Sequence, residues 1–182
     1  MTFNVTEVLS DFTRRYVELW QEKTGFPPAS RELYGIPSPC IERTGDGVVH
    51  WLPRTFSVQE KLSKVEAALE IRLQDSIHDY YVMQFAGDMT ASFEGQSFSL
   101  IQVWSEDDFI RLQENLIGHL ITQKRLKLSP TVFIGTTDSD MGLISVCNLT
   151  GQVIFEQFGS DNRETLSPDL ASFLSAIHPV MS

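Results

Sequence analysis

The longest helical pattern in the chain runs from Trp104 to Leu128. Apolar side chains recur there at steps of three and four residues, at Phe109, Leu112, Leu116 and Leu120, and Ile110, Ile117 and Ile121 widen the same stripe. A stripe of this width is typical of a helix with one broad face buried against other elements. The sequence therefore predicts a core helix around which the rest of the fold is arranged.

The start of this helix carries its own signals. Ser105 followed by Asp108 fits the spacing of a capping box, and Glu106 and Asp107 complete an acidic first turn. Lysine and arginine residues crowd the last turn, so the charge order already complements the helix dipole. Asp107 also has Arg111 four residues further on as a possible weak partner. The acidic turn thus has a structural explanation as well as a functional one.

Four other segments have helical spacing and are predicted as helices: Thr6–Lys23, with Thr6 as its cap, Ser57–Glu70, Asp75–Met83 and Pro168–Ile177. Apolar and β-branched runs predict strands at Val48–Leu52, Thr131–Thr136, Leu143–Cys147 and Val153–Phe155, and a hairpin from Ala91–Phe93 and Phe98–Val103. Short turns between consecutive strands favour antiparallel pairing. We therefore expect an α+β fold, a single domain over residues 1–182, with amphipathic helices packed on one face of a mostly antiparallel sheet.

The sequence contains none of the common catalytic, phosphate-binding or metal-binding motifs. The chain contains no glycine-rich phosphate loop, no GxSxG elbow and no HExxH motif, and its two cysteines are not spaced as a metal or redox pair. The four histidines, at positions 50, 78, 119 and 178, are far apart in sequence and are interpreted as structural. We therefore predict no catalytic residues, no cofactor and no metal. No apolar run approaches the length of a membrane span, which favours a cytoplasmic protein.

Charge is the most informative bulk property. The net charge is -10, and from Leu73 to Ile110 the chain has seven carboxylates and no lysine or arginine. This balance argues against nucleic acid or anionic lipid as a direct partner and favours a basic protein segment. A solvated acidic face that only keeps the protein soluble is the alternative, and charge by itself leaves both open.

Five blocks add a more specific indication. They are LYGIPSPC at Leu33–Cys40, which its prolines make an ordered loop, QFAGDM at Gln84–Met89, WSEDDF at Trp104–Phe109, QENLIGHLITQKRLKL at Gln113–Leu128 and ISVCNLTG at Ile144–Gly151. In this order they resemble the Syd family of SecY-interacting proteins, whose fold is related to the SUKH superfamily. The N-terminal helix and the segment after Gly151 resemble that family only in type.

The resemblance implies a non-enzymatic bacterial protein that attaches peripherally to the cytoplasmic face of the inner membrane by binding SecY. It implies a regulator or quality-control factor of the protein translocase that favours uncomplexed or badly assembled SecY. The family's contact is an acidic concave groove. From charge and block position we assign this SecY-binding groove to Asp79, Asp88, Glu94, Glu106, Asp107 and Asp108, with Asp88 and Glu106 as the first choices.

Two other functional classes stay open from the sequence. An immunity-type inhibitor of a basic toxin or nuclease would also need an acidic face. A hydrolase would need two distant carboxylates in one deep pocket, with a raised carboxyl pKa. A shared acidic surface favours the two binding functions, whereas a deep pocket with a raised carboxyl pKa favours the hydrolase.

Overall fold

The computed structural model describes residues 4–139 and 141–181. This part of the chain contains five α-helices: α1 (Val5–Thr24), α2 (Ser63–Leu69), α3 (Asp75–Tyr81), α4 (Glu106–Arg125) and α5 (Leu170–Ala176). Their buried side chains share one hydrophobic core with the strands. The α+β fold predicted from the sequence is confirmed.

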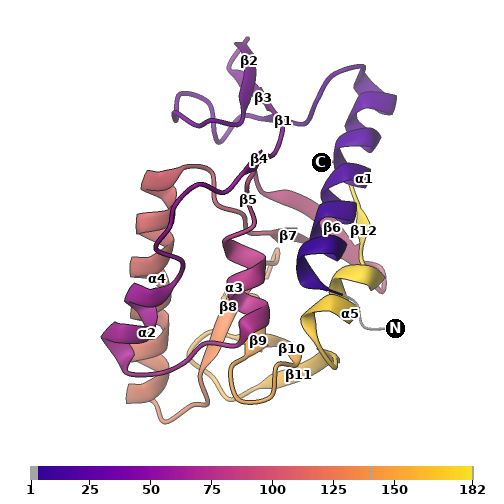
Figure 1. The fold of residues 1–182 in the computed structure, drawn as a ribbon. Helices are drawn as coiled ribbons and strands as arrows, with labels where there is room; N and C mark the ends of the chain where they lie inside the picture. The colour runs from indigo at the N-terminus through magenta and orange to yellow at the C-terminus, as the bar shows by residue number, and fades with distance from the viewer. Residues whose placement is uncertain (1–3, 140, 182) are drawn as a thin grey trace.

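A seven-stranded sheet forms the centre of the molecule (Figure 1). Its order is β11 (Arg163–Ser167), β10 (Val153–Gln157), β9 (Gly142–Cys147), β8 (Thr131–Thr136), β7 (Gln96–Leu100), β6 (Met89–Phe93) and β12 (His178–Pro179). Every neighbouring pair in it is antiparallel. The predicted hairpin is confirmed as β6 and β7, with slightly shifted bounds.

Two small sheets complete the fold. One consists of β1 (Ala29–Ser30), β3 (Val48–Trp51) and β2 (Ile41–Gly45), and the other of β4 (Arg54–Thr55) and β5 (Gln84–Phe85). Figure 1 places the three-stranded sheet above the start of α4, with α1 running along the other side of the molecule. The loop Leu33–Cys40, between β1 and β2, thereby comes close to the main body.

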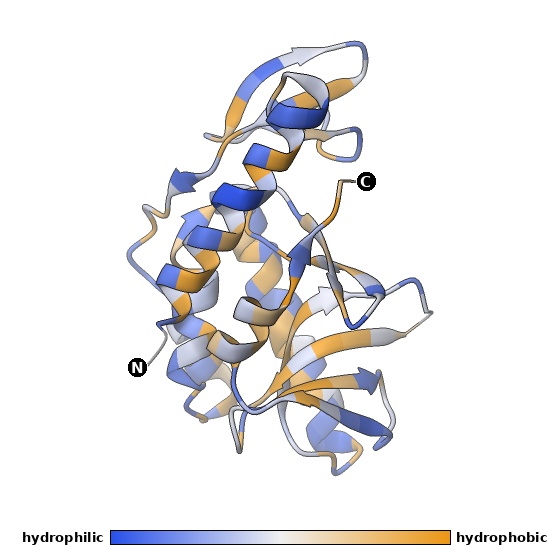
Figure 2. Ribbon diagram, turned by 90° about the vertical axis from the view of Figure 1, so that its right-hand side faces the viewer, coloured by the Kyte–Doolittle hydropathy of each residue, from blue (hydrophilic) through white to orange (hydrophobic). Residues whose placement is uncertain are grey.

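Helix α1 begins one residue earlier than the sequence predicts. Asn4, and not Thr6, is its N-cap, because the Asn4 side chain accepts a hydrogen bond of 2.9 Å from the Thr6 backbone N–H. Hydrophilic and hydrophobic bands alternate along this helix in Figure 2. Leu9, Phe12 and Tyr16 are buried on its inner side, as its spacing predicts.

Helix α4 confirms the predicted stripe only in part. Phe109, Leu112, Leu116 and Leu120 are buried, but Ile110 and Ile121 are 51% and 42% exposed. The expectation that these two isoleucines widen the buried face is wrong, because successive helical side chains point about 100° apart and the sheet covers only one arc of the helix.

Helices also lie on both faces of the sheet, which corrects the expectation of a single covered face. Phe98 of β7 contacts Phe173 of α5, with ring centroids 5.7 Å apart. Phe133 of β8 contacts His119 of α4 at 5.2 Å. The strand registers put Phe98 and Phe133 on opposite faces, so the sheet is buried from two sides near its middle.

Tertiary packing shortens α2. The pattern from Ser57 predicts a helix, yet the helix begins at Ser63. The preceding Phe56 ring packs between Phe85 and Phe109, at 4.9 and 5.0 Å between centroids. This contact fixes the chain beside α4 before the helix can begin.

Candidate functional site

The N-terminus of α4 is capped by side chains of its own first turn. The Ser105 hydroxyl accepts a hydrogen bond of 3.1 Å from the Asp108 N–H, and the Asp108 carboxylate accepts one of 2.8 Å from the Trp104 N–H. The predicted capping role of Ser105 is confirmed. The Asp108 carboxylate therefore has a structural role in the cap, whereas the Glu106 and Asp107 side chains are exposed.

Arg111, the partner expected for Asp107, lies beside Asp108 instead. The Arg111 guanidinium lies 3.8 Å from the Asp108 carboxylate, one helical turn away. A pair this long and this exposed contributes little to stability. Within the described residues Glu106 and Asp107 form no ion pair, so their charges remain available at the surface.

Asp88 lies beside the segment that leads into α4. Its carboxylate accepts a hydrogen bond of 2.8 Å from the Gln102 backbone N–H, and the Ala86 N–H donates to the Val103 carbonyl at 2.9 Å. Between them, Gly87 packs flat against the indole of Trp51, where a Cβ atom would come within 2.5 Å of Nε1. Close packing of this backbone therefore sets the position of Asp88.

The electrostatics of Asp88 show which other acids lie near it. Its side chain reaches the solvent, yet the pKa of its carboxyl is raised to about 6. The largest cause is desolvation by the surrounding protein, and the negative charges of Asp108 and Glu32 raise the pKa further. The sequence did not single out Glu32, which is distant along the chain from the other acids. Asp88, Asp108 and Glu32 thus form one cluster from three separate segments.

The ordered loop Leu33–Cys40 brings Glu32 to this place. The Trp104 indole N–H donates to the Ile36 carbonyl at 2.9 Å, and the Ser38 hydroxyl donates to the Trp104 carbonyl at 2.6 Å. Trp104 is itself buried, so the loop is attached to a rigid part of the fold. The same loop presents Tyr34, which is 49% exposed.

We call these three carboxylates, together with Glu106 and Asp107 in the same first turn of α4 as Asp108, the α4 acidic surface; its members are Glu32, Asp88, Glu106, Asp107 and Asp108. The structure does not bring Glu94 to it. Glu94 sits in the turn between β6 and β7, at the other end of a five-residue strand, about 20 Å along the chain from Asp88 at about 3.3 Å per residue. Asp79 lies on the exposed side of α3, and within the described residues no hydrogen bond or ion pair joins it to the others.

The described residues give no indication of a metal centre, since no group of three or more histidine, cysteine, aspartate or glutamate side chains is placed to hold an ion there. Three of the four histidines have separate partners: His50 contacts the Pro27 carbonyl, His78 contacts Glu66 and His119 contacts Thr131. Both cysteines are free. None of the helices in the described part of the chain is long and apolar enough to span a membrane.

Helices on an antiparallel sheet, with an acidic surface at the start of a core helix, define an α+β protein without a metal centre among the described residues. A family model described as Syd protein (SUKH-2) matches residues 6–179. The chain therefore belongs to the Syd family, as the sequence blocks indicate.

Proteins from several bacteria match this chain over nearly its full length. A Protein Syd from Photorhabdus laumondii subsp. laumondii is 70% identical over 181 residues, which cover 99% of this chain and 98% of the relative. Proteins of the same name from Yersinia pestis and Yersinia pseudotuberculosis are 56% identical over 181 residues, covering 100% of this chain and 99% of each relative.

Proposed function

We propose that this protein is a binding protein without catalytic activity, which docks on the cytoplasmic side of SecY through the α4 acidic surface and regulates or quality-checks the translocase. The observation that carries the proposal is that Asp108 and Glu32, from two other segments, lie near enough to Asp88 for their negative charges to contribute to its raised pKa. Carboxylates held together in this way gain most from a cation supplied by a partner.

Charge also supports the kind of partner. Cytoplasmic loops of bacterial membrane proteins are rich in lysine and arginine, whereas the lipid surface itself is anionic. A protein with a net charge of -10 is repelled by the lipid and attracted by the loops. Its peripheral association with the inner membrane would then depend on the channel protein. Tyr34 adds an exposed ring on which an arginine or lysine can stack.

The hydrolase alternative required a raised carboxyl pKa and a deep pocket in the same place. Asp88 has the raised pKa, but neither the hollow of about 520 Å³ beside Glu94 and Phe155 nor the open one of about 530 Å³ beside α1 is lined by Asp88 or by residues of α4. The two features are separated, and binding is the function that the geometry supports best.

Co-purification with SecY from detergent extracts tests the proposal. We compare the wild type with a double variant, Glu106→Gln with Asp107→Asn, at about 50 mM and about 300 mM salt. Both side chains are exposed and neither makes an ion pair among the described residues, so folding should be preserved. We expect about tenfold weaker capture of SecY by the double variant at low salt, and weaker capture of the wild type at high salt.

A matched control removes two negative charges elsewhere: Glu22→Gln on α1 with Asp161→Asn, both exposed. This control should retain wild-type capture. Equal loss in both double variants would show that net charge alone matters and would contradict the assignment to this surface. Capture of a basic toxin in place of SecY from the same extracts would instead support the immunity-type function.

A further inference from the structure

The central sheet divides between β7 and β8. These strands pair at two positions only, Ser99 with Thr136 and Leu100 with Gly135. Beyond Thr136 the chain turns away into the hairpin with β9, where the Thr137 N–H donates to the Gly142 carbonyl. The first half of β7 therefore has β6 on one side and, within the described residues, no strand on the other.

The tight turn between β6 and β7 determines which backbone groups of β7 face this gap. Glu94 and Gly95 both have positive φ angles, of 48° and 82°, which is the geometry of a two-residue hairpin turn. Phe93 and Gln96 are then a hydrogen-bonded pair, and Ser92 and Ser97 are a non-hydrogen-bonded pair. The N–H and C=O of Ser97 consequently point away from β6 and into the gap.

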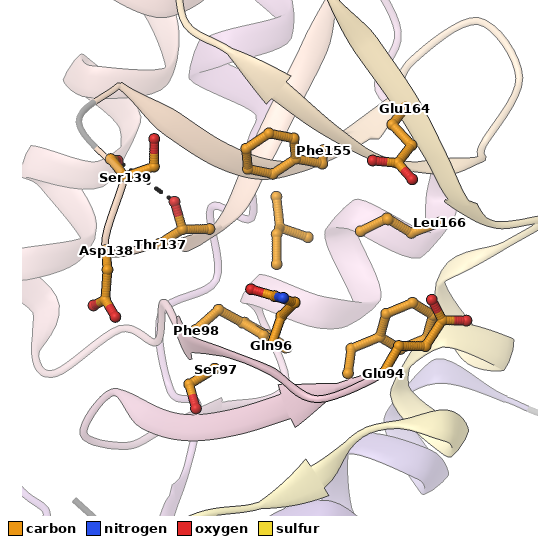
Figure 3. A pocket seen from close by; sticks show the side chains of 12 residues that line it. Glu94, Gln96, Ser97, Phe98, Thr137, Asp138, Ser139, Phe155, Glu164 and Leu166 are labelled. Carbon is orange, nitrogen blue, oxygen red and sulfur yellow. Dashed lines mark hydrogen bonds between the residues drawn. The ribbon is translucent and has the colours of Figure 1, made fainter.

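An open hollow of about 520 Å³ occupies the gap. Its lining includes the apolar side chains of Phe98, Ile144, Phe155 and Leu166. Figure 3 shows Phe98 of the β6–β7 hairpin on one side of the hollow and Phe155 and Leu166 of β10–β11 on the other. The hollow thus combines an unpaired strand edge with apolar surface for side chains next to that edge.

The charged side chains around the hollow are all negative. Glu94, Asp138 and Glu164 contribute carboxylates, and its lining contains no lysine or arginine. A strand that entered the gap beside Ser97 would therefore meet three carboxylates and no cation of the lining, which favours a segment that carries lysine or arginine.

We propose that this hollow binds an extended lysine- or arginine-bearing segment of a partner protein, which adds to β7 as a strand. Its backbone hydrogen-bonds with Ser97, and alternate side chains contact the apolar lining and the carboxylate rim. The site lies at the Glu94 end of β6, away from the α4 acidic surface, and does not depend on that surface for its function.

A peptide of about seven residues that alternates lysine and valine, blocked at both ends, is the probe. We expect chemical-shift changes on titration to concentrate at residues 94–98, 137–139 and 164–166. A peptide with glutamate in place of lysine should not bind. A lysine peptide with N-methylated backbone should bind at least tenfold more weakly, because it cannot complete the ladder.

Ser97→Pro is the sharpest variant. Proline removes the outward N–H of Ser97 without removing a hydrogen bond to β6, so the fold should survive and binding should fall at least tenfold. Glu94→Gln with Glu164→Gln should also weaken binding, and the matched pair Glu22→Gln with Asp161→Asn should not. Unchanged affinity in Ser97→Pro, shifts confined to α4, or no binding at about 1 mM peptide would each overturn the proposal.

Discussion

The Asp88 carboxylate accepts a hydrogen bond of 2.8 Å from the backbone N–H of Gln102 and so links the start of β6 to the segment that enters α4. The same carboxylate is the one whose pKa is raised to about 6. Asp88 therefore makes a structural hydrogen bond, while its ionised form lowers the stability of the fold. A substitution that removes only the charge separates these two effects.

Replacing Asp88 with asparagine keeps an acceptor for the Gln102 N–H and removes the charge. An unfolded aspartate has a pKa of about 3.9, so the raised pKa means that ionised Asp88 destabilises the fold above about pH 6. This destabilisation decreases as the pH falls from about 6 to about 4. Because the side chain is exposed, we expect Asp88→Asn to raise the unfolding free energy at pH 7 by about 1 kcal/mol or less.

Urea unfolding at pH 7, 5.5 and 4 measures this difference, which should shrink to zero at the lowest pH. A variant less stable than the wild type at pH 7 would show that the charged hydrogen bond outweighs the electrostatic cost.

Binding of a basic partner should depend on the protonation state of the Asp88 carboxyl. A cation next to Asp88 favours its ionised form, so acidification through about pH 6 should weaken SecY binding if the proposed function is correct. Affinity measured between pH 7.5 and 5.5 tests this. The Asp88→Asn protein should bind more weakly at pH 7.5 and show a smaller change with pH. An identical pH dependence in both proteins would exclude Asp88 as its source.

Gly87 should tolerate no side chain. A Cβ atom there would come within 2.5 Å of Nε1 and 2.7 Å of Cε2 of Trp51, which is buried and stacked on Tyr16. Gly87→Ala should lower the unfolding free energy by about 1–3 kcal/mol, since the indole cannot move without disturbing the core. Denaturation followed by tryptophan fluorescence measures the loss.

Gly118→Ala on α4 is the matched control. Nothing lies within 4 Å of a Cβ atom at this helical position. Alanine should therefore stabilise the protein by about 0.5–1 kcal/mol through its higher helix propensity. Equal effects of the two alanine substitutions would contradict the packing argument.

Thr131 connects α4 with the far strands of the sheet. Its hydroxyl donates to the Glu156 carboxylate at 2.6 Å and accepts from the Gln123 amide at 2.6 Å, with His119 Nε2 at 3.0 Å. All four residues are buried. Thr131→Val keeps the shape but leaves Glu156 with Arg163, at 3.7 Å, as its remaining polar partner among the described residues.

We expect Thr131→Val to lower the unfolding free energy by about 2–4 kcal/mol, because buried polar groups lose their partner. Thr136→Val, at the exposed end of the same strand, should change it by less than about 0.5 kcal/mol. Urea unfolding of both variants at pH 7 makes the comparison. A small effect at both positions would mean that the buried groups find other partners.

Local spacing along the chain determined much of this fold. The stripe from Phe109 to Leu120, the Ser105 cap and the apolar strand Thr131–Thr136 depend on side chains close in sequence, and all three are found. Strand β11 is mostly polar, with sequence RETLS, so its alternation gives no signal of a strand until β10 pairs with it.

Tertiary structure decided which acids share a surface. Sequence order grouped Glu94 with Asp88, but the length of β6 separates them, because an extended strand advances about 3.3 Å per residue. Glu32 joined the cluster because the loop Leu33–Cys40 is attached to Trp104. Charge and periodicity are properties of neighbouring residues, whereas a surface is formed by segments that only long-range packing brings together.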